Sequence, residues 1–218
     1  EALKIVPPQV LSGQVEASST LKPAIAYSKD NLFDSRKEFC WVEGNPATAG
    51  EGERLKFSFT DPKVNISAIQ IWNGYQRSDE HFEANARVRD FEIATPDGTV
   101  KTYTLRDTKA GQRIELSPAI TSGEFTLTVK SIYPGKKYKD LTISEILFFE
   151  GERPFIIQSD LSEKIQTETR TKSQSSPLAG LLDRRVSNTM NLDGTMLVDQ
   201  SIILRSDGTP IYNLAVVS

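Results

Sequence analysis

The sequence predicts an all-β fold made of many short strands. Apolar residues recur at every second position in several short segments, which is the period of a strand with one buried face. Turn sequences rich in Gly, Pro and Asp separate these segments. With 218 residues, 38% hydrophobic and 25% charged, the chain is large enough for one sizeable core with appendages. Many short strands at this spacing are typical of a β-sandwich or barrel.

The strand pattern follows an N-terminal lead. Residues 1–18 contain Pro7-Pro8, which blocks regular structure, so we expect the folded domain to span residues 19–152. The alternating positions are Leu55, Phe57 and Phe59; Ile69, Ile71, Asn73 and Tyr75; Phe91 and Ile93; Tyr103 and Leu105; and Phe125, Leu127 and Val129. The turn signals between them are Pro96-Asp97-Gly98, Lys109-Ala110-Gly111 and Ser122-Gly123. Each alternating group predicts one strand with an inward apolar face.

The composition changes after residue 152. Residues 153–177 are mostly polar and are expected to form a linker, and residues 178–185 favour a short helical turn. Two Asp-Gly-Thr turns follow, at 193–195 and 207–209. The second lies between SIILR and PIYNLAVV, which predicts a hairpin. We interpret residues 178–218 as a short β-rich extension or as the start of a truncated second domain.

The last predicted strand of the domain contains an acid among apolar residues. The alternating apolar positions are Leu141, Ile143, Leu147 and Phe149. Glu145 falls on the same face, where a lone buried charge is too costly. Four explanations remain open: a protonated carboxyl, a bound cation, an ion pair with an arginine such as Arg36, or a bulge that turns Glu145 outward.

Charge and hydropathy argue against two classes of partner. The net charge of −3 is not that of a general nucleic-acid binder, which usually carries a basic surface. No apolar run approaches the roughly 20 residues of a transmembrane helix. The chain begins at Glu1 without a signal-peptide pattern, so we expect any targeting segment to have been removed.

No catalytic arrangement can be named from the sequence. His81 is the only histidine and lies in the polar run SDEHFEAN, with no nucleophile motif beside it. Cys40 is the only cysteine, which excludes an intramolecular disulfide and a zinc cluster, and its context FCWV indicates a core thiol. No pair of acids stands in a recognisable glycosidase context. We therefore expect that the protein is not an enzyme.

Five collinear segments carry a family resemblance. They are YSKDNLFDSRKEFCWVEG (27–44), GEGERLKFSF (50–59), IQIWNGYQ (69–76), NARVRDFEI (85–93) and SIYPGKKYKDLTISEILFFEG (131–151). Residues 19–152 resemble a discoidin-like, galactose-binding-type domain, and more specifically the NADase-type glycan-binding domain of bacterial secreted and surface proteins. The resemblance implies a discoidin-like jelly-roll β-sandwich. It does not imply that the chain cleaves NAD, since in the toxin that gives the name the domain accompanies the catalytic part.

The resemblance also implies a structural calcium ion. In the wider fold an Asp in the early loop and a Glu on the last strand help to hold calcium, together with backbone carbonyls. Asp34 in NLFDSRKEFCW and Glu145 in TISEI match these positions. Calcium takes six to eight oxygen ligands, many of them carbonyls, so two carboxylates can suffice. The ion would hold the loop in place rather than take part in chemistry.

Two segments supply residues suited to sugar recognition, which uses aromatic rings and planar polar groups on loops. The candidates are Asn73, Tyr75, Gln76, Asn85, Arg87, Tyr133, Lys136 and Tyr138. Tyr75 or Tyr133 would stack on the sugar, and Asn85 and Arg87 would donate hydrogen bonds. In the alternative interpretation Asn73-Gly74 is a turn and Arg87 a structural ion pair. The lysines at 136, 137 and 139 form either a solvated turn or a contact for an acidic glycan.

Together these observations predict a non-catalytic carbohydrate-binding module, used for adhesion or targeting, on an exported bacterial protein. Its location would be secreted or cell-surface, and its partner a glycan or a glycosylated surface. The alternative is a structural or protein–protein interaction module. In that case the sandwich is a scaffold, and the C-terminal hairpin assembles with a host protein or a second copy.

Overall fold

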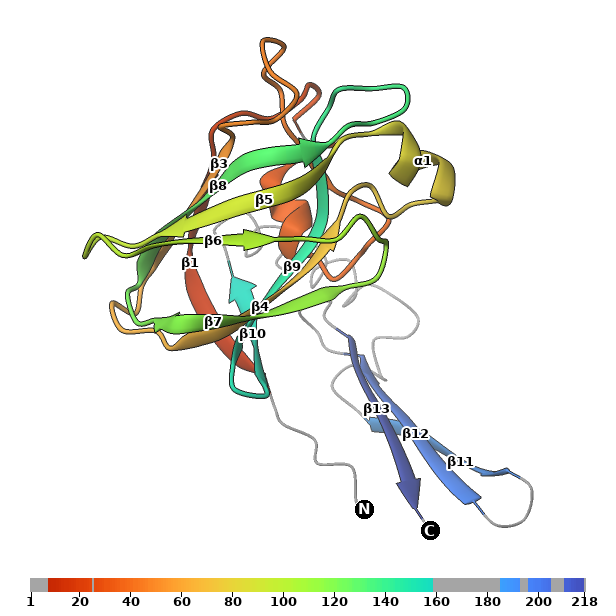
Figure 1. The fold of residues 1–218 in the computed structure, drawn as a ribbon. Helices are drawn as coiled ribbons and strands as arrows, with labels where there is room; N and C mark the ends of the chain where they lie inside the picture. Colours follow the sequence, from red (N-terminus) through yellow and green to blue (C-terminus); the bar gives the residue numbers. More distant parts are fainter. Residues whose placement is uncertain (1–7, 25, 159–184, 193–195, 205–209, 218) are drawn as a thin grey trace. The chain divides into compact units, whose positions relative to one another are not determined.

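The computed structural model describes residues 8–24, 26–158, 185–192, 196–204 and 210–217 (Figure 1). The chain divides into two compact units, one around the described residues 8–158 and one around those of 185–217. Each unit is described by itself below. None of the described helices has the length and apolar character needed to cross a membrane.

The first unit is a two-layered β-sandwich, which confirms the predicted all-β class (Figure 1). Its strands are β1 (Gln9–Ala17), β2 (Trp41–Val42), β3 (Arg54–Phe59), β4 (Ile66–Asn73), β5 (Arg87–Ala94), β6 (Val100–Thr104), β7 (Gln112–Ile120), β8 (Glu124–Tyr133), β9 (Thr142–Glu150) and β10 (Arg153–Gln158). They pair in the order β6-β5-β8-β3-β1-β10-β9-β4-β7, and β2 adds to β9. A 3-10 helix η1 (Lys29–Phe33) and a helix α1 (Asp79–Ala84) complete the unit.

Strand β1 joins the two layers. Residues 9–12 pair in parallel with β10 of one layer, and residues 13–17 pair antiparallel with β3 of the other. These residues were expected to belong to a lead, because Pro7-Pro8 lies just before them and blocks regular structure. Leu11 and Val15 point inward, but the position between them is Gly13, which has no room for a side chain against Ser58 and Phe59. The sandwich therefore begins ten residues before the expected start.

Strand β10 extends the sandwich beyond the expected end as well. Its residues Phe155 and Ile157 are buried in the same core as Leu11. Parallel pairing with β1 supplies the backbone hydrogen bonds of this segment. The first residues of the expected polar linker thus form the strand that closes one side of the sandwich.

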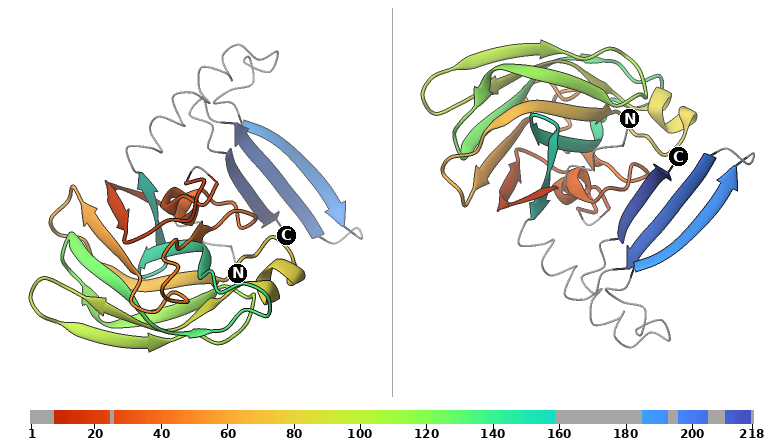
Figure 2. Two further views of the ribbon diagram at one scale, coloured as in Figure 1. Left: turned by 90° about the horizontal axis from the view of Figure 1, so that it is seen from above. Right: turned by 90° about the horizontal axis from the view of Figure 1, so that it is seen from below.

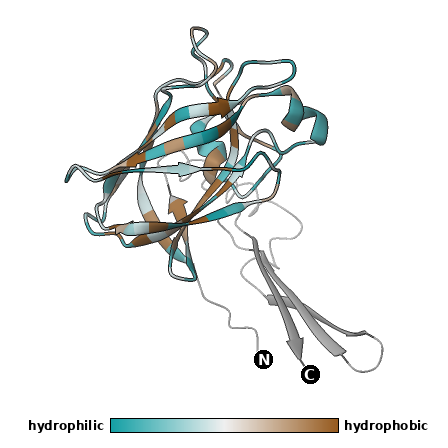
Figure 3. Ribbon diagram, in the orientation of Figure 1, coloured by the Kyte–Doolittle hydropathy of each residue, from teal (hydrophilic) through white to brown (hydrophobic). Residues whose placement is uncertain are grey.

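Phenylalanine rings fill the centre of the sandwich. Phe57 and Phe125 stack with centroids 4.7 Å apart, and Phe148 meets Phe57 edge-on at 5.2 Å. All three side chains are almost completely buried, and each contributes about 1.5–3 kcal/mol by leaving water. Figure 3 shows the alternation of apolar and polar residues along the strands that produces this core.

A β-bulge in β9 changes the direction of Glu145. Trp72 of β4 lies opposite Glu145, but the next residue of β4, Asn73, lies opposite Ile143, so Ser144 is an extra residue. Ile143 therefore points into the core, whereas Glu145 shares the outer face with Trp72. The expectation that Ile143 and Glu145 share one face is wrong, because the bulge reverses the alternation between them. The residues nearer the end of β9 keep a regular period.

The second unit contains a three-stranded antiparallel sheet (Figure 2). Its strands are β11 (Arg185–Leu192), β12 (Met196–Leu204) and β13 (Pro210–Val217), in that order. The β12–β13 pairing, from Leu204 opposite Pro210 to Leu197 opposite Val217, confirms the predicted hairpin. Residues 159–184, which hold most of the expected linker and helical turn, lie outside the described residues.

Candidate functional site

Three connecting segments converge at one end of the sandwich. They are residues 74–86 with α1, residues 105–111 after β6, and residues 133–140 at the end of β8 (Figure 1). Lys109 reaches Asp79 at 2.7 Å, and the Tyr133 hydroxyl donates to the Leu105 carbonyl at 2.9 Å. All eight predicted ligand residues lie in these segments or at the adjoining strand ends, so the fold brings them together.

Arg87 holds the three segments to one another. Its Nε and Nη2 donate to the two carboxylate oxygens of Asp107 at 2.8 and 2.7 Å. Its Nη1 donates to the carbonyl of Asn85 at 2.7 Å and, at longer range, to those of Phe82 and Pro134. The Arg87 side chain is only 8% exposed. The guanidinium is therefore occupied by the protein, which agrees with the structural ion pair considered for this residue rather than with a ligand contact.

Asn73 and Asn85 are also buried and bonded to backbone. The Asn73 amide donates to the Val88 carbonyl at 2.6 Å and accepts from the Val88 amide at 3.0 Å, which links β4 to β5. The Asn85 amide donates to the His81 carbonyl at 2.8 Å, at the end of α1. These contacts fix the backbone beneath the surface and leave Asn73 no exposed area.

The remaining predicted residues lie nearer the surface. Tyr75 is half-buried with its ring edge-on to His81 at 4.9 Å, and Gln76 is half-buried with its Nε2 2.5 Å from the Asn73 carbonyl. Tyr138 is 45% exposed, and Lys136 is exposed and paired with Glu83. Tyr133 is half-buried.

The 133–140 segment is attached to α1 through backbone hydrogen bonds. The amides of Lys136, Lys137 and Tyr138 donate to the last carbonyls of the helix, those of Glu83 and Ala84. Gly135 allows this approach, since a Cβ there would lie 2.4 Å from the Ala84 carbonyl oxygen. The helix end and the loop thus form one rigid support.

Two residues of this end were not identified from the sequence. Asp107, the partner of Arg87, lies 20 positions further along the chain, and no local pattern connects the two. Lys109, which pairs with Asp79, stands in a segment interpreted only as a turn signal. The Arg87–Asp107 and Lys109–Asp79 ion pairs each join segments that are distant in the sequence, so the sequence alone does not reveal them.

Asp34, at the end of η1, and Glu145 of β9 lie at a separate place, close enough for the charge of Asp34 to act on Glu145. Glu145 is only 6% exposed, and its Oε2 is buried without a hydrogen-bond partner. Burial, and next the negative charge of Asp34, raise the pKa of Glu145 to about 8. Burial likewise raises the pKa of Asp34 to about 6. Arg36 pairs with Glu38 at 3.0 Å, and among the ion pairs of the described residues none joins Arg36 to Glu145.

This pair of carboxylates has the chemistry of a hard-cation site. A buried oxygen without a donor, beside a second carboxylate, is an arrangement that a bound cation satisfies. Among the described residues no group of three or more His, Cys, Asp or Glu stands ready for a metal. Further ligands to calcium would therefore be carbonyl oxygens or water. The Asp34 and Glu145 side chains fit a calcium ion as its two charged ligands.

Comparison with known proteins identifies the domain. The family model of the NAD glycohydrolase translocation F5/8 type C domain matches residues 9–149. The family 32 CBM of NanJ from C. perfringens, solved with galactose, is 15% identical over 63% of this chain and 93% of that chain, with a TM-score of 0.48. The F5/8 type C domain of a Bacteroides fragilis protein is 16% identical over 64% and 96%, with a TM-score of 0.48.

A third structure is a whole enzyme. The arabinofuranosyltransferase AftD from Mycobacteria is 17% identical over 66% of this chain but only 11% of its own length, with a TM-score of 0.47. No curated protein matches the chain. The family model covers the strands from β1 to β9, apart from the last residue of β9, and the expected discoidin-like resemblance is confirmed. The chain belongs to the family of NAD glycohydrolase translocation F5/8 type C domains.

Proposed function

We propose that this protein is a non-catalytic carbohydrate-binding module, used for adhesion or targeting, on a secreted or cell-surface bacterial protein. One observation carries the proposal. At one end of the sandwich, loops fixed by the buried Arg87 display Tyr75, Gln76 and Tyr138. Because the loops are already ordered, a ligand meets little entropic cost of immobilising them.

The surface groups suit a sugar. A tyrosine ring packs against the C–H face of a pyranose, and its hydroxyl also bonds a sugar hydroxyl. Tyr75 and Tyr138 take the stacking role in this proposal, and Gln76 and Lys136 the polar one. Asn73, Asn85 and Arg87 become positioning residues, because their polar atoms are bonded to the protein. Tyr133 supports the loop through its bond to Leu105.

In this proposal calcium has a structural role. Asp34 and Glu145 would hold the ion, whose charge would neutralise the two buried carboxylates and so fix the loop after η1. The unpartnered Oε2 of Glu145 supports this assignment.

We assign no catalytic role to the Ser78–His81 contact. Ser78 Oγ lies 2.8 Å from the His81 ring and also accepts from the His81 amide. Ser78 is the N-cap of α1, so this geometry is that of a helix start. A nucleophile–base pair would need a third group to orient the imidazole, and none bonds it in the described residues.

A glycan array with the full chain tests the proposal, run with calcium and again with EDTA. We expect binding to a defined sugar class, reduced at least about tenfold in Tyr75→Ala or Tyr138→Ala with an unchanged melting temperature. Val100→Ala is the matched control, since Val100 is exposed but starts β6 at the opposite end. Binding that survives both tyrosine variants would refute the site.

A second candidate function is protein–protein interaction. The observation that favours it is the separate β11–β13 sheet, whose outer strands β11 and β13 each have one neighbour within the described sheet. A free strand edge readily pairs with another chain. Deletion of residues 178–218 separates the two functions. Loss of a complex with sugar binding intact would assign assembly to this sheet.

A further inference from the structure

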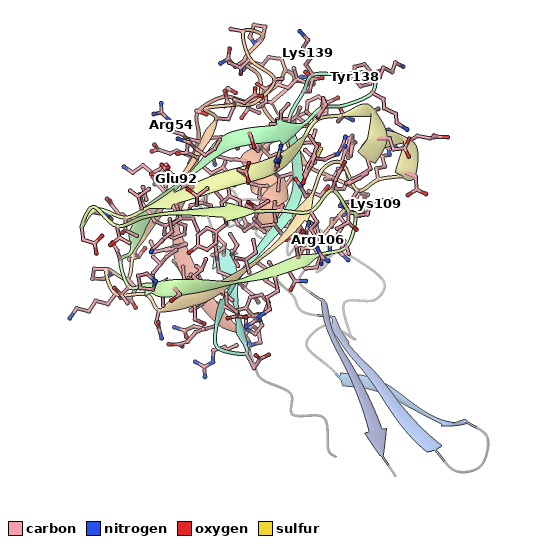
Figure 4. All side chains as sticks on the ribbon, viewed as in Figure 1. Arg54, Glu92, Arg106, Lys109, Tyr138 and Lys139 are labelled. Carbon is pink, nitrogen blue, oxygen red and sulfur yellow. The ribbon has the colours of Figure 1, made fainter. Side chains whose placement is uncertain are left out.

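The loop between β8 and β9 contains the exposed residues Lys137, Tyr138 and Lys139, called here the 137–139 tip. Figure 4 shows Tyr138 and Lys139 at the margin of the sandwich, directed away from it. Tyr138 is the only aromatic side chain among the large exposed apolar residues of the described part of the chain.

The tip is held in place although it is exposed. Three consecutive amides, those of Lys136, Lys137 and Tyr138, donate to carbonyls at the end of α1 over 2.8–3.1 Å. Gly135, two residues before the tip, lies against the Ala84 and Tyr138 carbonyl oxygens, both 2.4 Å from the position of an added Cβ. The backbone of the tip is therefore pre-organised, which favours recognition over a merely solvated turn.

The positive charge of the tip is only partly neutralised. Lys136, just before it, forms an ion pair with Glu83 at 2.5 Å. Lys137 and Lys139 have no such partner among the ion pairs of the described residues. Lys137 instead lies over the Tyr138 ring, 5.0 Å from its centroid. Two unneutralised cations flank an exposed ring in a chain whose net charge is −3.

We infer that the 137–139 tip binds an acidic sugar, a residue that carries a carboxylate or a sulfate ester, within the proposed glycan ligand. Tyr138 contacts the sugar ring, and Lys137 and Lys139 contact the acidic group. An ammonium is a compact charge that suits such an anion. This inference rests on the proposed carbohydrate function and gives it a substrate class.

An acidic lipid surface would offer the tip the same negative charge as an acidic sugar. Binding to it would, however, require more apolar side chains than the tip has. Membrane-surface binding combines cations with apolar side chains that enter the interface. Tyr138 is the only large apolar residue of the tip, and the neighbouring Tyr133 is bonded inward to Leu105. The tip therefore favours a sugar, and lipid becomes an outcome of the test.

The test is native affinity electrophoresis of the full chain. The gels contain chondroitin sulfate, polygalacturonate or neutral galactomannan, and binding to vesicles with and without phosphatidylserine is measured in parallel. We expect retardation by the two acidic polymers that high salt abolishes. The variant K137Q/K139Q should bind them roughly five- to thirty-fold more weakly, since each exposed charge pair contributes modestly.

The matched control is K56Q/K101Q, which removes two exposed lysines from β3 and β6 and changes the net charge equally. It should bind within about twofold of the unmodified protein, because dissolved salt screens the interaction between the ligand and exposed charges far from the site. An equal loss in the control would overturn the inference, since it would show a general charge effect. All variants should keep the melting temperature, as every altered side chain is exposed.

The other outcomes separate this inference from the proposed function. Retardation in galactomannan alone, unaffected by K137Q/K139Q, overturns the acidic-sugar assignment and leaves the carbohydrate function standing. Failure to bind any polymer or any array glycan removes both. Binding to phosphatidylserine vesicles alone, lost in K137Q/K139Q, assigns the tip to lipid and also overturns the inference.

Discussion

Arg87 and Asp107 form a two-point ion pair, with Nε to Oδ1 at 2.8 Å and Nη2 to Oδ2 at 2.7 Å. The arginine is buried, whereas the aspartate is 38% exposed on its loop. A planar guanidinium matches both oxygens of a carboxylate, which makes this geometry specific to arginine. The pair fastens a loop to a strand start beneath the surface that we propose for binding.

Replacing Arg87 should unfold the protein more readily rather than remove a ligand contact alone. We expect Arg87→Ala to lower the free energy of unfolding by about 3 kcal/mol, because the ion pair and the bonds to buried carbonyls are lost together. Arg87→Lys should recover only part of the lost free energy of unfolding. Urea titration measures the stability of both variants. Arg89→Ala on the same strand is the control, with an expected loss below about 0.5 kcal/mol, since Arg89 is 57% exposed. Equal losses in the two alanine variants would contradict the role of Arg87.

The stability of the calcium-free protein should fall as the pH rises. Burial raises the pKa of Glu145 from 4.5 to about 8 and that of Asp34 from 3.8 to about 6. The folded state then binds more protons than the unfolded state between these values, so unfolding becomes easier from about pH 4 to pH 8. Melting temperatures in EDTA at pH 5 and pH 8 check this. Glu145→Gln should weaken the dependence of the melting temperature on pH. If that dependence is unchanged in the variant, groups other than Glu145 cause it.

Calcium should reverse this loss at pH 8. A cation that binds the two deprotonated carboxylates stabilises the folded state by mass action. We expect the melting temperature at pH 8 to rise with millimolar calcium and to return when EDTA is added. Glu145→Gln should abolish the rise, whereas Glu124→Gln, an exposed acid at the start of β8, should keep it. A rise that persists in Glu145→Gln would place the ion at another site.

Gly135→Ala should loosen the loop after β8. The added Cβ would lie 2.4 Å from two backbone oxygens, so the loop must leave α1. We expect a loss of stability of about 1–2 kcal/mol together with loss of glycan binding. Gly98→Ala provides the comparison. It carries a positive φ of 87° and should cost about 1 kcal/mol, but it lies in the β5–β6 turn at the opposite end. Glycan binding should therefore survive in Gly98→Ala, and its survival in Gly135→Ala would contradict the rigid support.

Strand β10 should be required for stability. A chain ending at residue 158 retains Phe155 and Ile157, which are 2% and 5% exposed in the core. Ending it at residue 152 removes both side chains and the parallel pairing with β1. We expect this shorter chain to lose at least about 4 kcal/mol, or not to fold, because each buried side chain contributes about 1.5–3 kcal/mol. Urea denaturation of the two truncated chains decides between this boundary and the one expected from the sequence.

Local patterns determined much of the architecture. The alternation of Leu55, Phe57 and Phe59 marked β3, and the Asp-Gly-Thr turn at 207–209 marked the β12–β13 hairpin. These signals suffice because side-chain direction in a strand and backbone conformation in a tight turn depend on neighbours in the chain. The five collinear segments indicated the family in the same way, which the match over residues 9–149 confirms.

The tertiary structure decided which segments pair with each other and which side chains are buried between them. Pro7-Pro8 indicated a lead, yet the next residues form β1, which pairs with β10 and β3 and has Gly13 where β3 approaches closely. In β9 one extra residue turned Glu145 to the outer face, yet the loop at Asp34 buried it again. Arg87 was expected at a ligand and is bonded to Asp107 instead. Burial and pairing between distant segments are properties of the packed chain, so no pattern within one segment determines them.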